Sequence, residues 1–335
     1  MQTRLAMFSV LLALQMAAVA QNDPFAFLQP TVTITADDRK RLDLGQPIAH
    51  VLPTRDLEVA VVAIVPVRID GNRLVAWVRE IEQLKHSPYV LAIHRFSNPP
   101  RLQDLDALTL DESDLSEIGR CGPGHCGLKL SDGEIRSLQQ PAAGGATGWQ
   151  TAVQERFRQL MLDRVEAYLA SGRVQHQSDA AGAGSDAFSE LVTHSDFLTA
   201  HAPRFADALR GAHTAADVES FLYWSKERLA RKPVISITDV NIVRGHDPRQ
   251  PDAVIAGKQI FATHYLNASL GLTALLPGRG GSNYLVYVNR SDVDALSGLF
   301  AGLTRFMIQR RLKADSIEVL ERLRRRLESG DPPTP

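Results

Sequence analysis

The stretch Val234-Ile-Ser-Ile-Thr-Asp-Val-Asn-Ile-Val243 is rich in β-branched residues, and its period of two predicts a β-strand. Three further segments with the same character follow it and are joined by turns rich in glycine and proline. These predicted strands cover residues 254–265, 268–276 and 283–289. Successive strands joined by short turns favour an antiparallel sheet.

Working outward from these strands, an earlier strand is predicted over Glu58–Ile69. Pro66 interrupts it, and since proline has no backbone donor we expect Pro66 at a sheet edge or a bulge. A helix over residues 74–84 and a short strand over 89–96 follow. At the other end, Ser291 and Asp294 are expected to cap a long helix that reaches about Glu328. The fold class is therefore α+β, an antiparallel sheet packed on a long C-terminal helix.

Helical spacing of apolar residues between these regions predicts an insertion over residues 150–222. Within this part of the chain, a helix is expected over 151–171 and a last one from Thr214 to about Leu229. The expected organisation is a signal peptide (1–20), an N-terminal arm (21–57), one domain (58–329) with its insertion, and a disordered tail (330–335).

The N-terminus has the pattern of a cleaved signal peptide. Arg4 precedes an apolar run from Leu5 that ends in Ala18-Val-Ala20, and cleavage is expected after Ala20. The run is shorter than the roughly 20 residues that span a bilayer, which disfavours the alternative of a retained anchor. We therefore expect a periplasmic or secreted protein.

Composition and motifs limit the partners and cofactors that we expect. The 37 basic and 38 acidic residues nearly balance, so nothing favours a nucleic-acid partner. In an oxidising compartment Cys121 and Cys126 are expected to form a disulfide, although a metal, haem or redox role remains open. Gly122–Gly127 satisfies G-x-G-x-x-G, but a strand pattern follows it instead of a helix, so a dinucleotide site is not expected. No metal site and no cofactor are predicted.

The order of elements resembles the START-like superfamily of helix-grip proteins. That resemblance covers roughly residues 58–140 and 225–328. It implies a curved sheet that wraps the last helix, with a hydrophobic cavity between them. Several short strings also resemble a family of uncharacterised exported bacterial proteins, which implies an envelope protein without indicating an activity. These strings are Arg120-Cys121 with His125-Cys-Gly-Leu-Lys-Leu130, Tyr223-Trp-Ser-Lys-Glu227, Lys258-Gln-Ile260 with His264-Tyr265, and Ser269-Leu-Gly-Leu-Thr273.

Candidate site residues come from two places. Lys226 and Glu227 could lie at the mouth of a cavity, where the lysine could meet an anionic headgroup, or they could simply face water. The strands add the remaining candidates for polar groups in an apolar pocket, the alternative being a solvated sheet face. These residues are Asp239, Asn241, Lys258, His264 and Tyr265.

Three functions remain open. The leading hypothesis is binding of a lipid or other hydrophobic small molecule between the sheet and the final helix. The second is an enzyme, cyclase- or hydrolase-like, that uses His264 with Asp239. The third is an envelope interaction protein without a pocket. The final helix carries eight basic residues, which indicate a solvated face or a weak contact with anionic lipid. The sequence gives no oligomeric state.

Overall fold

The structure of the chain is a computed structural model. It describes residues 23–55, 57–122, 125–143, 148–174, 187–211, 217–229, 231–245, 250–278, 280–297 and 301–330. The predicted signal peptide and most of the predicted tail lie outside the described residues, so neither prediction is tested.

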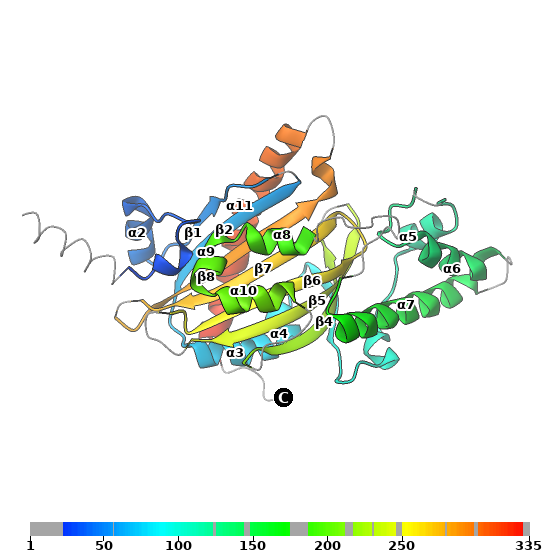
Figure 1. Ribbon diagram of the computed structural model, residues 1–335, viewed down its shortest axis with the longest axis horizontal. Helices are drawn as coiled ribbons and strands as arrows, with labels where there is room; N and C mark the ends of the chain where they lie inside the picture. The colour runs from blue at the N-terminus through cyan, green and yellow to red at the C-terminus, as the bar shows by residue number, and fades with distance from the viewer. Residues whose placement is uncertain are drawn as a thin grey trace, which may run out of the picture.

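One antiparallel sheet forms the centre of the molecule (Figure 1). Its eight strands lie in the order β1-β2-β8-β7-β6-β5-β4-β3. The strands are β1 (Ile48–Val51), β2 (Glu58–Val67), β3 (Val90–Arg95), β4 (Glu219–Arg228), β5 (Pro233–Arg244), β6 (Ala253–Ala262), β7 (Leu266–Leu276) and β8 (Asn283–Val293). The predicted α+β class with an antiparallel sheet is confirmed.

Local sequence rules explain the strands that were predicted. The predicted strands 234–243, 254–265, 268–276 and 283–289 correspond to β5, β6, β7 and β8. Pro66 pairs with Tyr284 of β8, while β1 pairs only with residues 61–64 of β2. On that side β2 is therefore an edge at Pro66, where a missing donor removes no ladder hydrogen bond.

The helix expected from Thr214 to Leu229 is wrong, because Glu219–Arg228 forms the strand β4. Residues Phe221–Lys226 are all buried, since helices or loops cover both faces of β4. A strand buried on both faces loses the alternation of polar and apolar residues that identifies a strand in a sequence. The predicted insertion 150–222 therefore ends too late.

Three helices lie in front of the sheet in Figure 1, namely α8 (Ala187–Thr193), α9 (Asp196–His201) and α10 (Pro203–Arg210). To the right of the sheet lie α5 (Glu112–Ile118), α6 (Asp132–Ala143) and α7 (Trp149–Ser171). We call the face of the sheet that is in front in Figure 1 the insertion face. The helical region begins at Leu102 with a 3-10 turn (η2, Leu102–Leu105), well before the predicted boundary at residue 150. The loop-rich composition of residues 101–140 concealed these short helices.

The N-terminal arm belongs to the domain. It contains the 3-10 turn η1 (Ala26–Leu28), the helix α2 (Ala36–Asp43) and β1 at the edge of the sheet. Phe27 packs on Phe197 of α9 with ring centroids 5.7 Å apart. The arm thus shares the apolar core of the insertion face.

The other face of the sheet carries α3 (Gly71–Arg79), α4 (Ile81–Lys85) and the long helix α11 (Ala301–Glu328), which lies behind the sheet in Figure 1. We call it the α11 face. Leu320 and Leu327 of α11 are buried there, and the helix contacts β1, β2 and α3. The predicted cap at Ser291 is wrong, because Ser291 still lies in β8 and η3 (Asp294–Leu296) follows. Among the described helices, none has both the length and the apolar character needed to cross a bilayer.

A buried ion pair ties the sheet to the insertion. Arg290 of β8 donates a short hydrogen bond to Glu58 of β2, and the two side chains are 2% and 4% exposed. Glu58 also contacts Nδ1 of His194, at the end of α8, at 2.8 Å. One carboxylate therefore links two strands and a helix.

Replacing Arg290 with methionine should lower the free energy of unfolding by about 3–5 kcal/mol, because Glu58 would keep a buried charge without its main partner. The double variant Glu58→Gln/Arg290→Met should be more stable than Arg290→Met alone, since no unpaired charge remains. Urea unfolding of wild type, Glu58→Gln, Arg290→Met and the double variant measures these differences. A double variant whose loss equals the sum of the two single losses would contradict the assignment.

Candidate ligand-binding site

The α11 face of the central strands is partly accessible, although the insertion face of the same strands is buried. In β7 and β8, buried and partly exposed residues alternate along much of each strand. The partly exposed residues on this face form what we call the accessible strip. They are Ser236, Thr238, Gly257, Ser269, Gly271, Thr273, Tyr287 and Asn289. The α11 helix packs mainly on β1 and β2, and this part of the sheet remains partly accessible.

The strip is built from small residues at its centre. Gly257 of β6 and Gly271 of β7 are direct cross-strand partners, so neither contributes a side chain. A side chain at Gly271 would approach the hydroxyl of Tyr287 at 3.7 Å. Paired glycines weaken a sheet interior and mark places where another group approaches the backbone closely. The strip is therefore partly accessible to solvent, and we call the accessible space above it, beside α11, the recess.

A charged pair lies at the β4 side of this strip. Lys85 of α4 donates to Glu227 at 2.7 Å and to the hydroxyl of Tyr223 at 3.2 Å. Ser225 donates to the same carboxylate at 2.6 Å. The side chains of Lys85 and Glu227 remain 29% and 31% exposed. They are thus accessible charges held in place by neutral hydroxyls.

Burial and the neighbouring opposite charge have opposite effects on the pKa values of Lys85 and Glu227. Burial would lower the pKa of Lys85, but the charge of Glu227 outweighs it and the pKa lies above its usual value. Burial would raise the pKa of Glu227, but Lys85 holds it below its usual value. Burial raises the pKa of Tyr287. At neutral pH the site therefore presents an ammonium, a carboxylate and a neutral phenol.

A groove of about 460 Å³ opens next to this pair, between the ends of β3 and β4 and the α11 helix. Its lining residues are Pro88, Tyr89, Arg228, Leu229, Arg311, Glu318 and Arg322. Tyr89 and Leu229 are 52% and 47% exposed. Arg322 pairs with Glu318 at 2.5 Å and stacks over the ring of Tyr89 at 5.7 Å. The groove joins apolar surface to guanidinium groups.

Of the ligand-binding residues predicted from sequence, only Glu227 belongs to this site. Lys226, its neighbour, points to the insertion face and pairs with Asp111, while the carbonyl of Thr109 accepts a second bond at 2.8 Å. Adjacent residues of a strand face opposite sides of a sheet, so the two could not share one cavity mouth. The prediction placed both on a helix end, where that rule does not apply.

Asp239, Asn241 and Lys258 share the insertion face. Asp239 and Lys258 are cross-strand partners, so they lie on one face as expected, and Asp239 accepts a hydrogen bond of 2.7 Å from Tyr168 of α7. Burial raises the pKa of Asp239. Lys258 is 2% exposed and donates to the carbonyl of Leu209 at 3.1 Å. These groups hold the insertion onto the sheet.

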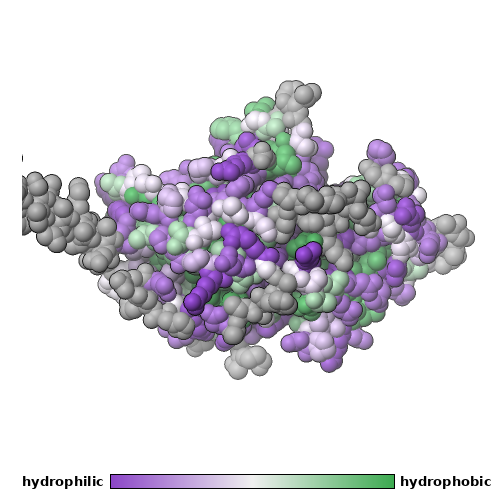
Figure 2. Space-filling model, in the orientation of Figure 1, coloured by the Kyte–Doolittle hydropathy of each residue, from purple (hydrophilic) through white to green (hydrophobic). Residues whose placement is uncertain are grey.

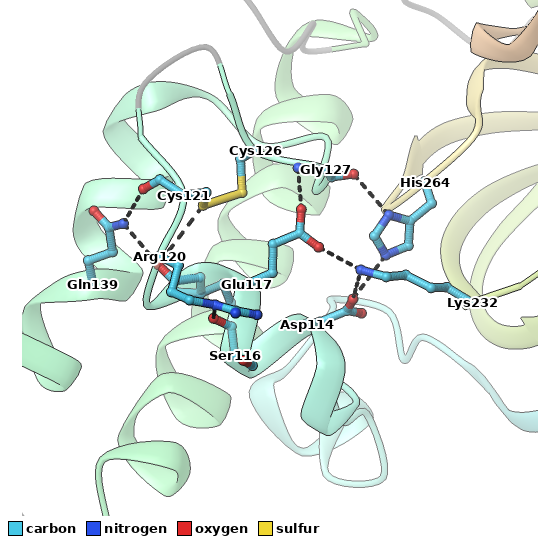
Figure 3. The surroundings of a disulfide bond; sticks show 11 residues. Asp114, Ser116, Glu117, Arg120, Cys121, Cys126, Gly127, Gln139, Lys232 and His264 are labelled. Carbon is cyan, nitrogen blue, oxygen red and sulfur yellow. Dashed lines mark hydrogen bonds and ion pairs between the residues drawn. A yellow bond between two sulfur atoms is a disulfide. The ribbon is translucent and has the colours of Figure 1, made fainter.

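His264 and Tyr265 lie at the turn between β6 and β7, where Tyr265 adopts a positive φ of 64°. His264 is 4% exposed, and its two ring nitrogens contact the Gly127 carbonyl at 2.9 Å and Asp114 at 3.2 Å (Figure 3). Both partners are acceptors. Both ring nitrogens of His264 are therefore engaged in contacts within the protein.

The same network holds the cysteine loop, because Lys232 bridges Asp114 and Glu117 at 3.0 and 2.5 Å, and Glu117 accepts from the backbone of Gly127 (Figure 3). The predicted disulfide between Cys121 and Cys126 is present. It closes the loop that Gly127 and His264 attach to the sheet.

The catalytic pairing of His264 with Asp239 is not formed. Both residues are described, and no hydrogen bond joins them, since His264 contacts Asp114 while Asp239 contacts Tyr168. A bulge between Ile237 and Thr238 also shifts the pairing of β5 with β6, so simple parity fails beyond Lys258. Among the described residues, no group of three or more His, Cys, Asp or Glu side chains could hold a metal ion.

Sequence reasoning missed Lys85, Tyr223 and Tyr287. Lys85 comes from a helix far along the chain, so no local pattern links it to Glu227. Tyr287 and Asn289 do alternate with buried valines in β8, and Gly257 and Gly271 interrupt two predicted strands. That pattern was the available signal for an accessible face.

Comparisons with known proteins add little. No protein-family model and no curated protein matches the chain. A similarity is found to the crystal structure of TTHA0849 from Thermus thermophilus, with 14% sequence identity and a TM-score of 0.25. The match covers 42% of this chain and 88% of that one. At this TM-score the similarity supports no conclusion about fold or function.

Replacing Asp114 with asparagine should lower the free energy of unfolding at pH 7 by about 3 kcal/mol, because His264 and Lys232 lose their shared carboxylate. Although burial opposes it, the bonds to His264 and Lys232 lower the pKa of Asp114 below 3.8. Its contribution is therefore complete above about pH 5 and disappears as the pH falls through the folded pKa. The variant should lose less stability on acidification.

Urea unfolding between pH 7 and pH 3 measures this difference. The matched control is Asp106→Asn, which removes an exposed carboxylate and should leave the pH profile unchanged. If the free energies of unfolding of wild type and Asp114→Asn changed in parallel with pH, Asp114 would not have the stabilising role assigned to it.

Proposed function

We propose that the protein binds an amphipathic small molecule, of the lipid type, in the recess between the sheet and α11. The observation that carries this proposal is the accessible strip, a row of small and polar residues in the middle of a sheet whose opposite face is dry. A folded protein gains stability by covering such a strip with large apolar side chains. Leaving it open is typical of a ligand site.

The topology supports the same proposal. From β2 onward the strand order is β2-β8-β7-β6-β5-β4-β3, with α3 and α4 between β2 and β3 and α11 after the last strand. This order is the one expected for a helix-grip protein of the START-like type. On this proposal, β1 and the helical insertion are additions to that scaffold.

The lining favours a ligand with two chemically different ends. Leu84, Ile93, Ile317 and Leu323 are only partly buried and offer apolar walls. Arg228, Arg311 and Arg322 lie at the groove and suit an anionic group. Within the recess, Lys85, Glu227 and Tyr287 can orient a polar group by hydrogen bonds. We therefore expect an acidic amphiphile in preference to a pure hydrocarbon.

We propose that the protein works in an oxidising compartment outside the cytoplasm. The disulfide between Cys121 and Cys126 is compatible with such a compartment. An exported binder of amphiphiles also agrees with the resemblance to exported bacterial proteins. The enzyme hypothesis based on His264 and Asp239 receives no support from their contacts, and an interaction protein without a pocket would not need the open strip.

Filling the recess tests the proposal. Thr273→Trp places a large side chain on the strip, opposite Tyr287, and should weaken binding of the fluorescent fatty acid cis-parinaric acid at least about tenfold, because the indole occupies the ligand's space. Fluorescence titration gives the Kd. Native mass spectrometry of wild type purified from a bacterial envelope should show a bound amphiphile.

The matched control is Thr193→Trp, which adds the same side chain at an exposed position of α8 on the insertion face and should bind as wild type does. Thermal unfolding checks that both variants are folded. Equal, saturable binding by Thr273→Trp, or the absence of saturation in wild type together with no bound species, would overturn the proposal.

A further inference from the structure

The first turns of α11 carry an apolar face that no described residue covers. Leu303, Phe306 and Met307 are 62%, 61% and 62% exposed. Their spacing of three and four places them, with Arg310, on one side of the helix. Figure 2 shows hydrophobic residues gathered at the top of the molecule, where Figure 1 places this segment beyond the end of the sheet.

The opposite side of the same segment already has a partner. Ile308 and Leu312 pack against Val59, Val293 and Leu296, at the ends of β2 and β8 and in η3. The segment is therefore fixed to the domain by one apolar side and presents a second one outward. Packing in the core therefore does not explain why apolar residues stand at positions 303, 306 and 307.

The charges within this segment have one sign. Residues 301–314 contain Arg305, Arg310, Arg311 and Lys313 and no acidic residue. Arg310 and Lys313 are exposed, and Arg311 is 77% exposed although it lies 3.5 Å from Asp315. An apolar face bearing Leu and Phe, flanked by Arg and Lys, is the composition of helices that lie in a membrane interface.

We infer that residues 301–313 dock the protein on an anionic lipid bilayer, with Leu303, Phe306 and Met307 inserted among the acyl chains and the flanking cations on the lipid phosphates. Charge complementarity selects this occupant. A second copy of the chain meeting the same patch about a two-fold axis would bring two cationic segments together, which is unfavourable.

Docking would also orient the proposed ligand site, and this part of the inference rests on the proposed function. Arg311 belongs both to the docking segment and to the lining of the groove. A bilayer bound by residues 301–313 therefore lies next to the groove. The class of ligand that this arrangement favours is an acidic membrane lipid taken directly from the bilayer surface.

Vesicle flotation with the purified mature protein tests the docking step. Wild type should bind vesicles of phosphatidylcholine with about 30% phosphatidylglycerol and bind pure phosphatidylcholine at least about tenfold less. Leu303→Ser/Phe306→Ser/Met307→Ser should reduce binding at least about tenfold. Arg310→Gln should reduce it about fivefold, because one basic residue near an anionic surface contributes about that factor.

Two matched controls sharpen the result. Arg325→Gln removes an exposed arginine from the far end of the same helix, and Leu44→Ser removes an apolar side chain that is 67% exposed elsewhere. Both should bind vesicles as wild type does. Circular dichroism melts verify folding of each variant.

Three outcomes would overturn the inference: no binding of wild type to anionic vesicles, equal binding by the triple variant, or equal losses in the control variants. If wild type does not bind vesicles and forms a dimer that the triple variant dissociates, the apolar face binds a second copy of the chain instead. The proposed ligand site is measured separately, by cis-parinaric acid titration without vesicles. The triple variant should retain that binding, and its loss in Thr273→Trp with flotation intact distinguishes the two proposals.

Discussion

The alternation of side chains along β5, β6, β7 and β8 is the constraint on which the rest of the molecule depends. Each residue of these strands faces either the insertion helices or α11, because successive side chains of a strand point to opposite sides. Val254, Ala256, Leu270 and Leu272 therefore enter a dry core on one side. Gly257, Gly271 and Thr273 remain partly accessible on the other. One sheet thus separates a closed face from a partly accessible face.

On the insertion face, ion pairs and hydrogen bonds as well as apolar contacts hold the insertion on the sheet. Glu58 connects Arg290 to His194, Asp239 accepts from Tyr168, and Asp114 connects His264 to Lys232. Each carboxylate joins the sheet to a helix or loop of the insertion. Leaving one of these groups unpaired would be costly, so the networks fix how the helices sit on the sheet. Asp239 and His264, the pair predicted for catalysis, contact other residues of these networks and not each other.

On the α11 face, by contrast, the charged groups are partly exposed. Lys85 and Glu227 neutralise each other and remain accessible, and the neighbouring strip offers hydroxyls, an amide and bare backbone. A charge pair held by Tyr223 and Ser225 is preorganised, so a ligand can exchange hydrogen bonds with it without a large rearrangement. The α11 helix packs mainly on β1 and β2, so the accessible strip beside it remains partly exposed. Its C-terminal half is anchored by Leu320 and Leu327, and its first turns extend past the sheet.

The sequence by itself determined the α+β class, the strands β5 to β8, the long final helix and the partner of Cys121, because these depend on local periodicity and on a short loop between two cysteines. It also placed Asp239 and Lys258 on one face, since parity holds as far as the bulge at Ile237. It failed at β4, where burial on both faces removes the alternation. Only the tertiary structure decided which face of the sheet remains accessible and carries the candidate site. The contact of Lys85 with Glu227 joins residues 142 positions apart, and whether α11 covers or exposes a strip depends on its packing on β1 and β2, which no local pattern encodes.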